Sequence, residues 1–165
     1  MTFNLIPFPM NPLRIRSLAP LIVLLLFFSS CKVTLVPPYN AAILEQIDQT
    51  TKEIDKFYLL MLETTSTQNG GRSYEQFAEQ YVDIEVELVS LLNKNKIRPL
   101  NANSVRICEI TLQLWTKYKE EHRTDNTLSD GLIKLNRKTL GDLLFAMQVA
   151  EKAKEIANSS PSQQP

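Results

Sequence analysis

The sequence predicts an all-α protein: an antiparallel four-helix bundle, with up-down-up-down topology, that follows a cleaved N-terminal leader. In four separate stretches after residue 40, apolar residues recur every three or four positions. This spacing places them on one face of a helix. No stretch carries a clear alternation of apolar and polar residues, which a half-buried strand would show. Four amphipathic helices without strands are typical of a bundle.

The first helix is expected over residues 40–64. Asn40 is a suitable N-cap because its side-chain oxygen can accept hydrogen bonds from the free amides of the first turn. An apolar stripe follows in alternating steps of three and four, with Thr51 in one of its positions. The apolar members of this stripe are Leu44, Ile47, Ile54, Tyr58 and Met61. Gly70 and Gly71 then end the helical tendency of the chain.

A capping box is predicted to open the second helix, with Ser73 capping the amide of Gln76 and Gln76 returning the bond. The stripe of this helix is the most regular in the chain. It comprises Tyr74, Phe77, Tyr81, Ile84, Leu88 and Leu91. A connection over residues 93–103 follows, and either Asn101 or Asn103 is expected to be the N-cap of the third helix.

The third helix, over about residues 104–123, is the most apolar of the four. Its apolar residues cover roughly 220° of a helical wheel. They are Val105, Ile107, Cys108, Ile110, Leu112, Leu114, Trp115 and Tyr118. A helix with so wide an apolar arc must contact neighbours on two sides or a partner. We therefore predict a partner surface at Trp115 and Tyr118, since exposed aromatic side chains mark interfaces.

The fourth helix is expected over about residues 128–157. Its predicted inner face consists of Leu132, Leu135, Leu143, Leu144, Met147 and Ala150. Gly131 and Gly141 each destabilise a helix by about 1 kcal/mol relative to alanine, which predicts a kink or break near residues 139–141. The tail over residues 158–165 is too polar to fold and is expected to be disordered.

An export signal precedes the helices. Arg14 and Arg16 come first, an apolar run covers residues 18–28, and two small serines stand before Cys31. The run has eleven residues, fewer than the roughly 20 that a membrane-spanning helix needs. An uncleaved membrane helix and an ordinary secretory signal are the alternatives. A start at Met10 instead of Met1 would give a conventional short basic leader.

The residues Phe28, Ser29, Ser30 and Cys31 resemble the end of a bacterial lipoprotein signal. The resemblance implies that the thiol of Cys31 receives a diacylglycerol, that the leader is cleaved before Cys31, and that the new amino terminus is acylated, for example with palmitate. Lys32 stands where an aspartate commonly retains lipoproteins in the inner membrane. The resemblance therefore implies the bacterial cell envelope, with the protein on the outer membrane and facing the periplasm.

These features divide the chain into four segments. They are a signal peptide over residues 1–30, a short proline-containing tether over 31–39, the bundle over 40–157 and the tail over 158–165. In the bundle, the 93–103 connection returns to the end where the first helix begins. It carries Lys94, Lys96 and Arg98 and no acidic residue. We predict that these three contact anionic lipid head groups, with a solvated loop as the alternative.

Composition excludes several kinds of site. The 18 basic and 18 acidic residues balance, so nothing indicates nucleic-acid binding. The chain has a single histidine, His122, and no cysteine pair beside a lipidated Cys31, so we predict neither a metal site nor a cofactor. His122 is expected to be exposed or to cap its helix. Cys108 is expected to be a buried thiol. Asp83 and Glu87 share one helix face and are interpreted as a solvated acidic surface.

Two kinds of function remain. The favoured one is a non-enzymatic lipoprotein whose helical module contacts an envelope protein or a second copy of itself. The alternative is a carrier that holds a small apolar ligand between its helices, in a cavity lined by Cys108, Leu112, Trp115 and Leu143. An exposed aromatic patch over a packed interior would favour the first function, and such a cavity would favour the second.

Overall fold

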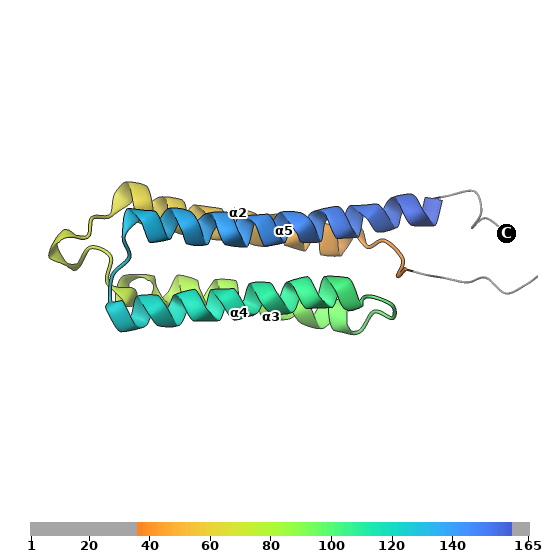
Figure 1. The fold of residues 1–165 in the computed structure, drawn as a ribbon, viewed down its shortest axis with the longest axis horizontal. Coiled ribbons are helices and arrows are strands. Elements are labelled where there is room, and N and C mark those ends of the chain that lie inside the picture. Colours follow the sequence, from red (N-terminus) through yellow and green to blue (C-terminus); the bar gives the residue numbers. More distant parts are fainter. Residues whose placement is uncertain (1–35, 160–165) are drawn as a thin grey trace, which may run out of the picture. The chain divides into compact units, whose positions relative to one another are not determined.

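The computed structural model describes residues 36–159 as a bundle of four helices. They are α2 (Ala41–Thr64), α3 (Ala78–Lys96), α4 (Ala102–Asp125) and α5 (Asp130–Ser159), and two 3₁₀ turns, η1 (Gln68–Gly70) and η2 (Tyr74–Phe77), precede α3. Over the described range there is no strand. Successive helices run in opposite directions (Figure 1), so the predicted all-α antiparallel bundle is confirmed. The predicted leader, Cys31 and residues 160–165 of the tail lie outside the described range.

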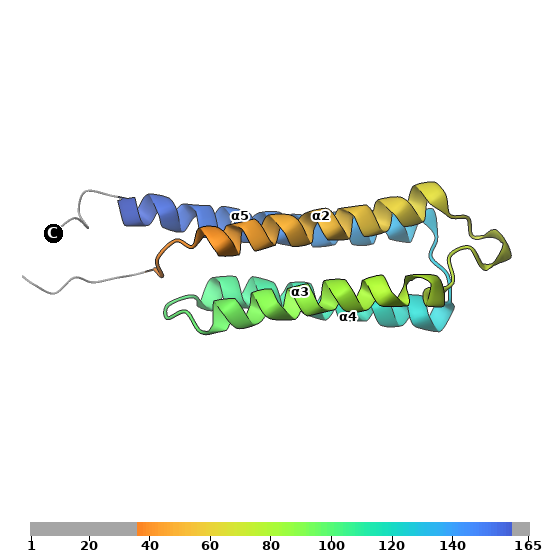
Figure 2. The ribbon, with the colours of Figure 1, turned by 180° about the vertical axis from the view of Figure 1, so that it is seen from behind.

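Each helix packs against two others. Helix α2 lies beside α5 and α3, while α4 lies beside α3 and α5. Figure 2 shows the same pairs from behind. The start of α2, the α3–α4 connection and the end of α5 share one end of the bundle, which we call the terminal end. The loop over residues 65–77 and the α4–α5 turn lie at the opposite end.

Helix α2 begins as predicted. Its N-cap Asn40 has extended backbone angles, and its Oδ1 accepts hydrogen bonds from the amides of Ala42 and Ile43 at 3.0 and 3.2 Å. The buried face of α2 consists of Ile43, Gln46, Ile47, Thr50, Ile54, Phe57, Tyr58 and Met61. The predicted stripe is thus confirmed at Ile47, Ile54, Tyr58 and Met61, while Leu44 is only partly buried.

The capping box predicted at Ser73 is wrong, because Ser73 precedes a 3₁₀ turn and its side chain makes no capping bond. Instead, Nε2 of Gln76 donates a hydrogen bond to the carbonyl oxygen of Gly70 at 2.9 Å. Phe77 then departs from helical angles, with φ −119° and ψ 1°, so α3 begins at Ala78. The stripe itself is confirmed: Phe77, Tyr81, Ile84, Leu88 and Leu91 are buried and Tyr74 packs against the core.

The connection between α3 and α4 is shorter than predicted, because α3 continues to Lys96 and α4 begins at Ala102. Asn101 precedes α4 but caps no amide with its side chain. Its Nδ2 donates to Oδ1 of Asn95 at 2.8 Å, and its Oδ1 accepts from Nζ of Lys154 at 2.7 Å. The tight turn places Leu100 at φ +59°, in the left-handed region.

Helix α5 is rotated relative to the prediction. Its buried residues are Ile133, Asn136, Leu140, Leu144, Met147, Glu151 and Lys154. The predicted inner face is confirmed at Leu144 and Met147, and Leu143 and Ala150 are partly buried. Leu132 and Leu135 are exposed, so their assignment to the inner face is wrong. The buried positions keep the spacing of three and four, but three of the seven carry polar side chains that the hydrophobic pattern passes over. Of the kink or break predicted near residues 139–141, the break is wrong, since α5 is one continuous helix of 30 residues.

Candidate functional site

Trp115 and Tyr118 do not form an exposed surface, so the predicted partner surface is wrong. Trp115 is fully buried and Tyr118 nearly so. The indole ring lies 5.5 Å from the ring of Phe57 and 5.1 Å from that of Tyr81, measured between centroids. Its Nε1 donates a hydrogen bond to the backbone carbonyl of Tyr81 at 3.2 Å. The indole therefore buries its apolar surface and satisfies its one donor inside the bundle.

The interior beside Cys108 is filled with protein. The sulfur of Cys108 lies 3.3 Å from the sulfur of Met147, and the gap around them leaves no space for a water molecule. The predicted buried thiol is confirmed. Burial raises the pKa of Cys108 to about 11, so the thiol is protonated at neutral pH and unreactive. The apolar ligand expected of a carrier would have no room here.

His122 is buried, so its predicted exposed or capping role is wrong. Its Nε2 lies 2.8 Å from the carbonyl oxygen of Arg72, and its Nδ1 lies 3.1 Å from the hydroxyl of Tyr81. A carbonyl can only accept, so we assign the proton to Nε2, and Nδ1 then accepts from the hydroxyl. Burial lowers the pKa of His122. The neutral ring uses both nitrogens to hold the 65–77 loop against α3 and α4.

Arg72 fastens the same loop to the start of α5. Its guanidinium is buried and donates to Oδ1 of Asp130 at 2.6 Å, to the carbonyl of Leu128 at 3.1 Å and to the carbonyl of Thr65 at 3.1 Å. The helical periodicity gives no signal for this residue, because it lies outside every predicted helix. His122 and Arg72 therefore both position the loop, and the hydrogen bonds that do so occupy both imidazole nitrogens and the guanidinium group.

A buried charge network occupies the terminal end. Glu151 is only 2% exposed, and its carboxylate accepts two hydrogen bonds of 2.9 Å from the guanidinium of Arg98 and one of 2.7 Å from Nζ of Lys154. Burial alone would raise the pKa of Glu151, but the bonds from Arg98, from Lys154 and from the amide of Asn40 lower it overall. The carboxylate is therefore ionised and holds both cations in place.

Arg98 is committed to this network, which makes its predicted contact with lipid head groups wrong. Lys94 and Lys96 remain exposed at the end of α3. Nζ of Lys94 donates to Oε1 of Gln46 at 2.8 Å, and Nζ of Lys96 lies 3.6 Å from Oε1 of Glu109. Surface contacts of this kind are weak and exchange readily with other partners. Contact of these two lysines with lipid stays a prediction.

The same network fixes where the chain enters the bundle. The amide of Asn40 donates to Oε1 of Glu151 at 2.8 Å, and the guanidinium of Arg98 donates to the carbonyl of Pro38. Pro37, just before it, is buried. The segment that leads into α2 is therefore held at the terminal end, beside the exposed lysines of α3.

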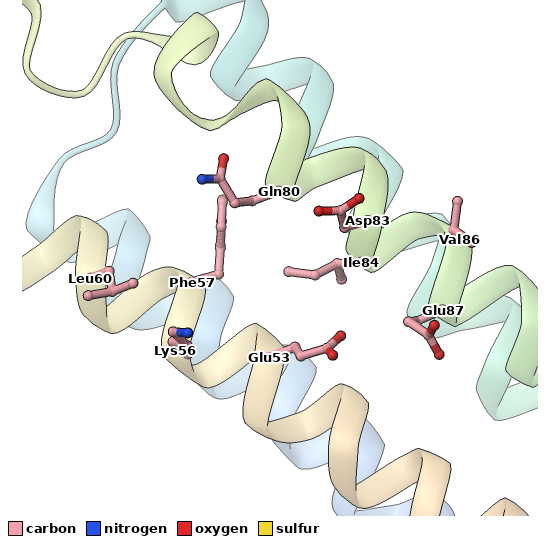
Figure 3. Close-up of a pocket in the computed structure, with 9 residues that line it drawn as sticks. All are labelled: Glu53, Lys56, Phe57, Leu60, Gln80, Asp83, Ile84, Val86 and Glu87. Atoms are coloured by element: carbon pink, nitrogen blue, oxygen red, sulfur yellow. The ribbon is translucent and has the colours of Figure 1, made fainter.

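A surface groove of about 520 Å³ lies between α2 and α3 (Figure 3), and we call it the α2–α3 groove. Its lining comprises Glu53, Lys56, Phe57, Leu60, Gln80, Asp83, Ile84, Val86 and Glu87. Phe57 and Ile84 are buried and form an apolar floor. Leu60 and Val86, which are 46% and 59% exposed, extend the apolar surface to the rims.

The groove carries an excess of negative charge, with three carboxylates and one ammonium group among its lining residues. The pKa of Glu53 is raised, first by partial burial and then by the nearby carboxylates of Glu87 and Asp83, while Lys56 opposes the shift. The single lysine therefore does not neutralise the groove. The acidic surface predicted at Asp83 and Glu87 is thus one wall of a partly apolar hollow.

Two helices expose a second apolar face. On α3, the exposed Val82, Val86 and Val89 follow steps of four and three on the side away from the buried stripe. On α5, the exposed Leu135, Phe145 and Val149 lie opposite the buried residues of that helix. We call Val82, Val86 and Val89 the α3 ridge. β-Branched valines have a low helix propensity, so their presence on this exposed face is better explained by contact with another molecule than by helix stability.

Residues 36–159 contain no group of three or more histidine, cysteine or acidic side chains placed to hold a metal ion. Among the described helices, none is both long enough and apolar enough to cross a membrane. Comparisons with protein-family models, curated proteins and solved structures found no match. The candidate site therefore depends on the geometry of the α2–α3 groove and the two exposed apolar faces.

Proposed function

We propose that the protein is a bacterial lipoprotein of the cell envelope, anchored through acyl groups on Cys31, whose bundle is a non-enzymatic interaction module. The observation that carries the proposal is that α3 is apolar on two opposite faces. One face forms the core, and the other carries the exposed Val82, Val86 and Val89. Val86 lines the α2–α3 groove, and all three valines line a second hollow with Lys119 of α4. An apolar ridge next to a hollow is typical of a surface that binds another protein.

The anchoring part of the proposal fits the position of the chain entry. A tether from Cys31 to residue 36 spans at most about 17 Å, so a lipidated Cys31 would hold the terminal end close to the bilayer. Lys94 and Lys96 would then face the head groups, and the α2–α3 groove would remain open along the side of the bundle. We place the protein on the outer membrane, facing the periplasm, from the lipoprotein resemblance and Lys32.

The carrier function has no comparable support. Its predicted cavity is occupied by the ring of Trp115 and by the packed sulfurs of Cys108 and Met147. A partner held on the outside of the bundle requires no such cavity.

The proposal is tested with the full chain in a diderm bacterium. We expect a palmitate analogue to label the wild type and not Cys31→Ala. A photoreactive residue at Val86 should give a discrete crosslinked protein product in the membrane fraction. The matched control is the exposed Gln113 on α4, which should give little. An unlabelled chain that keeps its leader contradicts the anchor, and equal crosslinking at the two positions contradicts the interaction module.

A further inference from the structure

We propose that the α2–α3 groove binds the outer face of α5 from a second copy of the chain. This inference depends on the proposed interaction module and names its partner. The groove requires a helix of about two turns, since its lining runs from Glu53 to Leu60 on α2 and from Gln80 to Glu87 on α3. About seven residues of helix rise about 10 Å. The partner must offer an apolar side chain for the floor and positive charge for the carboxylates.

Helix α5 offers both on one side. Leu135 is 57% exposed, and Lys134 and Lys138 precede and follow it within about one turn and are also exposed. Further along the helix, Phe145 is 65% exposed on this outer face. We call Lys134, Leu135 and Lys138 the α5 key, since Phe145 lies ten residues beyond Leu135 and therefore outside the two turns that the groove can take. In the groove, Leu135 would meet the floor of Phe57 and Ile84.

The charges of the two surfaces match. The lysines of the α5 key would lie against the carboxylates of Glu53 and Asp83. Lys138 already forms a pair with Asp142, with both side chains more than 60% exposed. Such an exposed pair contributes little stability and can exchange for another acid without a large loss. Partial burial and, after it, repulsion from Glu87 and Asp83 raise the pKa of Glu53, and an incoming ammonium group would relieve the repulsion.

One molecule cannot make this contact with itself. The α5 key faces outward, opposite the buried side of α5, while the groove opens between α2 and α3. The interface is therefore heterologous, with different surfaces on the two copies, so one copy keeps a free key and the other keeps a free groove. The contact is small, so we expect weak association in solution. Confinement of anchored copies to a membrane would raise their effective concentration.

The test uses two differently tagged full-length chains, expressed together, with Val86→Cys in one and Leu135→Cys in the other. After mild oxidation by copper phenanthroline in membranes and in detergent, we expect a disulfide-linked dimer of the two tags. The native Cys108 is buried and serves as an internal control. In the matched control, the chain with Val86→Cys is exchanged for one with Gln113→Cys, on α4. This pair should give at least about fivefold less disulfide-linked dimer.

Charge reversal decides between this partner and others. Glu53→Lys with Asp83→Lys in the groove chain should lower the crosslinked fraction at least about fivefold, and Lys134→Glu with Lys138→Glu in the α5 chain should restore it. Circular dichroism checks that each variant is folded. Four results overturn the proposal: no product between the two chains, product only between two Val86→Cys chains, no effect of charge reversal, and capture of a different basic protein in place of α5. Crosslinking in detergent does not need the anchor, so after a negative palmitate result the test is run with Cys31→Ser in both chains, which removes that free thiol.

Discussion

Replacing Glu151 by glutamine is expected to destabilise the bundle by about 3–5 kcal/mol, the loss typical of removing one partner from a buried charge network. The carboxylate accepts four hydrogen bonds: two from Arg98, one from Lys154 and one from the amide of Asn40. A glutamine amide has one oxygen, so its NH₂ group must face two of these four donors. Those donors would lose their acceptor, and the buried Lys154 and the partly buried Arg98 would lose their counterion.

The free energy of unfolding is measured by urea denaturation of residues 32–165, which contain the whole described bundle, followed by far-UV circular dichroism. With a slope of about 2 kcal/mol per molar urea, the midpoint should fall by about 2 M. Lys152→Ala is the matched control, because Lys152 lies beside the network but pairs with Glu155 on the surface. That change should leave the urea midpoint nearly unchanged, because an exposed pair contributes little to stability. A loss below about 1 kcal/mol for Glu151→Gln would refute the role assigned to this carboxylate.

The network also predicts the response to acid. Because the pKa of Glu151 is lowered in the folded protein, its contribution is present above the unfolded value near 4.5 and is lost as the pH falls through the folded value. The wild type should therefore lose stability below about pH 4.5 more steeply than Glu151→Gln. Parallel acid titrations of the two proteins would contradict this assignment.

Three further predictions concern other groups. Burial lowers the pKa of His122, so below about pH 6.5 the unfolded chain binds a proton that the folded protein does not. The free energy of unfolding of the wild type should therefore fall with decreasing pH, by up to about 1.4 kcal/mol per pH unit. His122→Gln should flatten this slope in urea titrations at about pH 7.5 and 5.5. Cys108 should react with a thiol reagent only after urea unfolding, whereas rapid reaction of the native protein would contradict its burial. The double variant Lys94→Ala, Lys96→Ala leaves Arg98 intact and should weaken the binding of residues 32–165 to anionic vesicles. The expected loss is about 30-fold, at about 1 kcal/mol per lysine. Unchanged binding would show that these lysines do not contact lipid.

The helices were predictable from sequence because their signal is local. The stripe from Phe77 to Leu91 repeats at three and four without interruption, and every member is buried. Asn40 caps α2 as its residue type and place indicate. The direction of each helix follows from short connections, so the up-down-up-down topology was also within reach.

The side chains that face inward were harder to predict where polar groups enter the core. Asn136, Glu151 and Lys154 occupy buried positions of α5, and a search for apolar periodicity chooses the leucines beside them. The burial of His122 depends on Arg72, which lies 50 residues away in a loop. The prediction that Trp115 is exposed was wrong for a different reason. A wide apolar arc shows that a helix has more than one contact, but does not show whether its aromatic residues face a neighbour or a partner.

The charge network explains why α5 keeps its rotation although both of its sides are apolar. If α5 turned to bury Leu135 and Phe145, Lys138 and Asp142 would enter the core and Glu151 would lose Arg98. Apolar burial alone distinguishes these two rotations poorly, whereas an unpaired buried charge costs several kcal/mol. We infer that the network at the terminal end both positions the chain entry and leaves the α5 key exposed. If Glu151 and Lys154 were replaced by leucine, Lys138 and Asp142 would still oppose that rotation and Arg98 would lose its acceptor, so a cysteine introduced at Leu135 should stay open to modification.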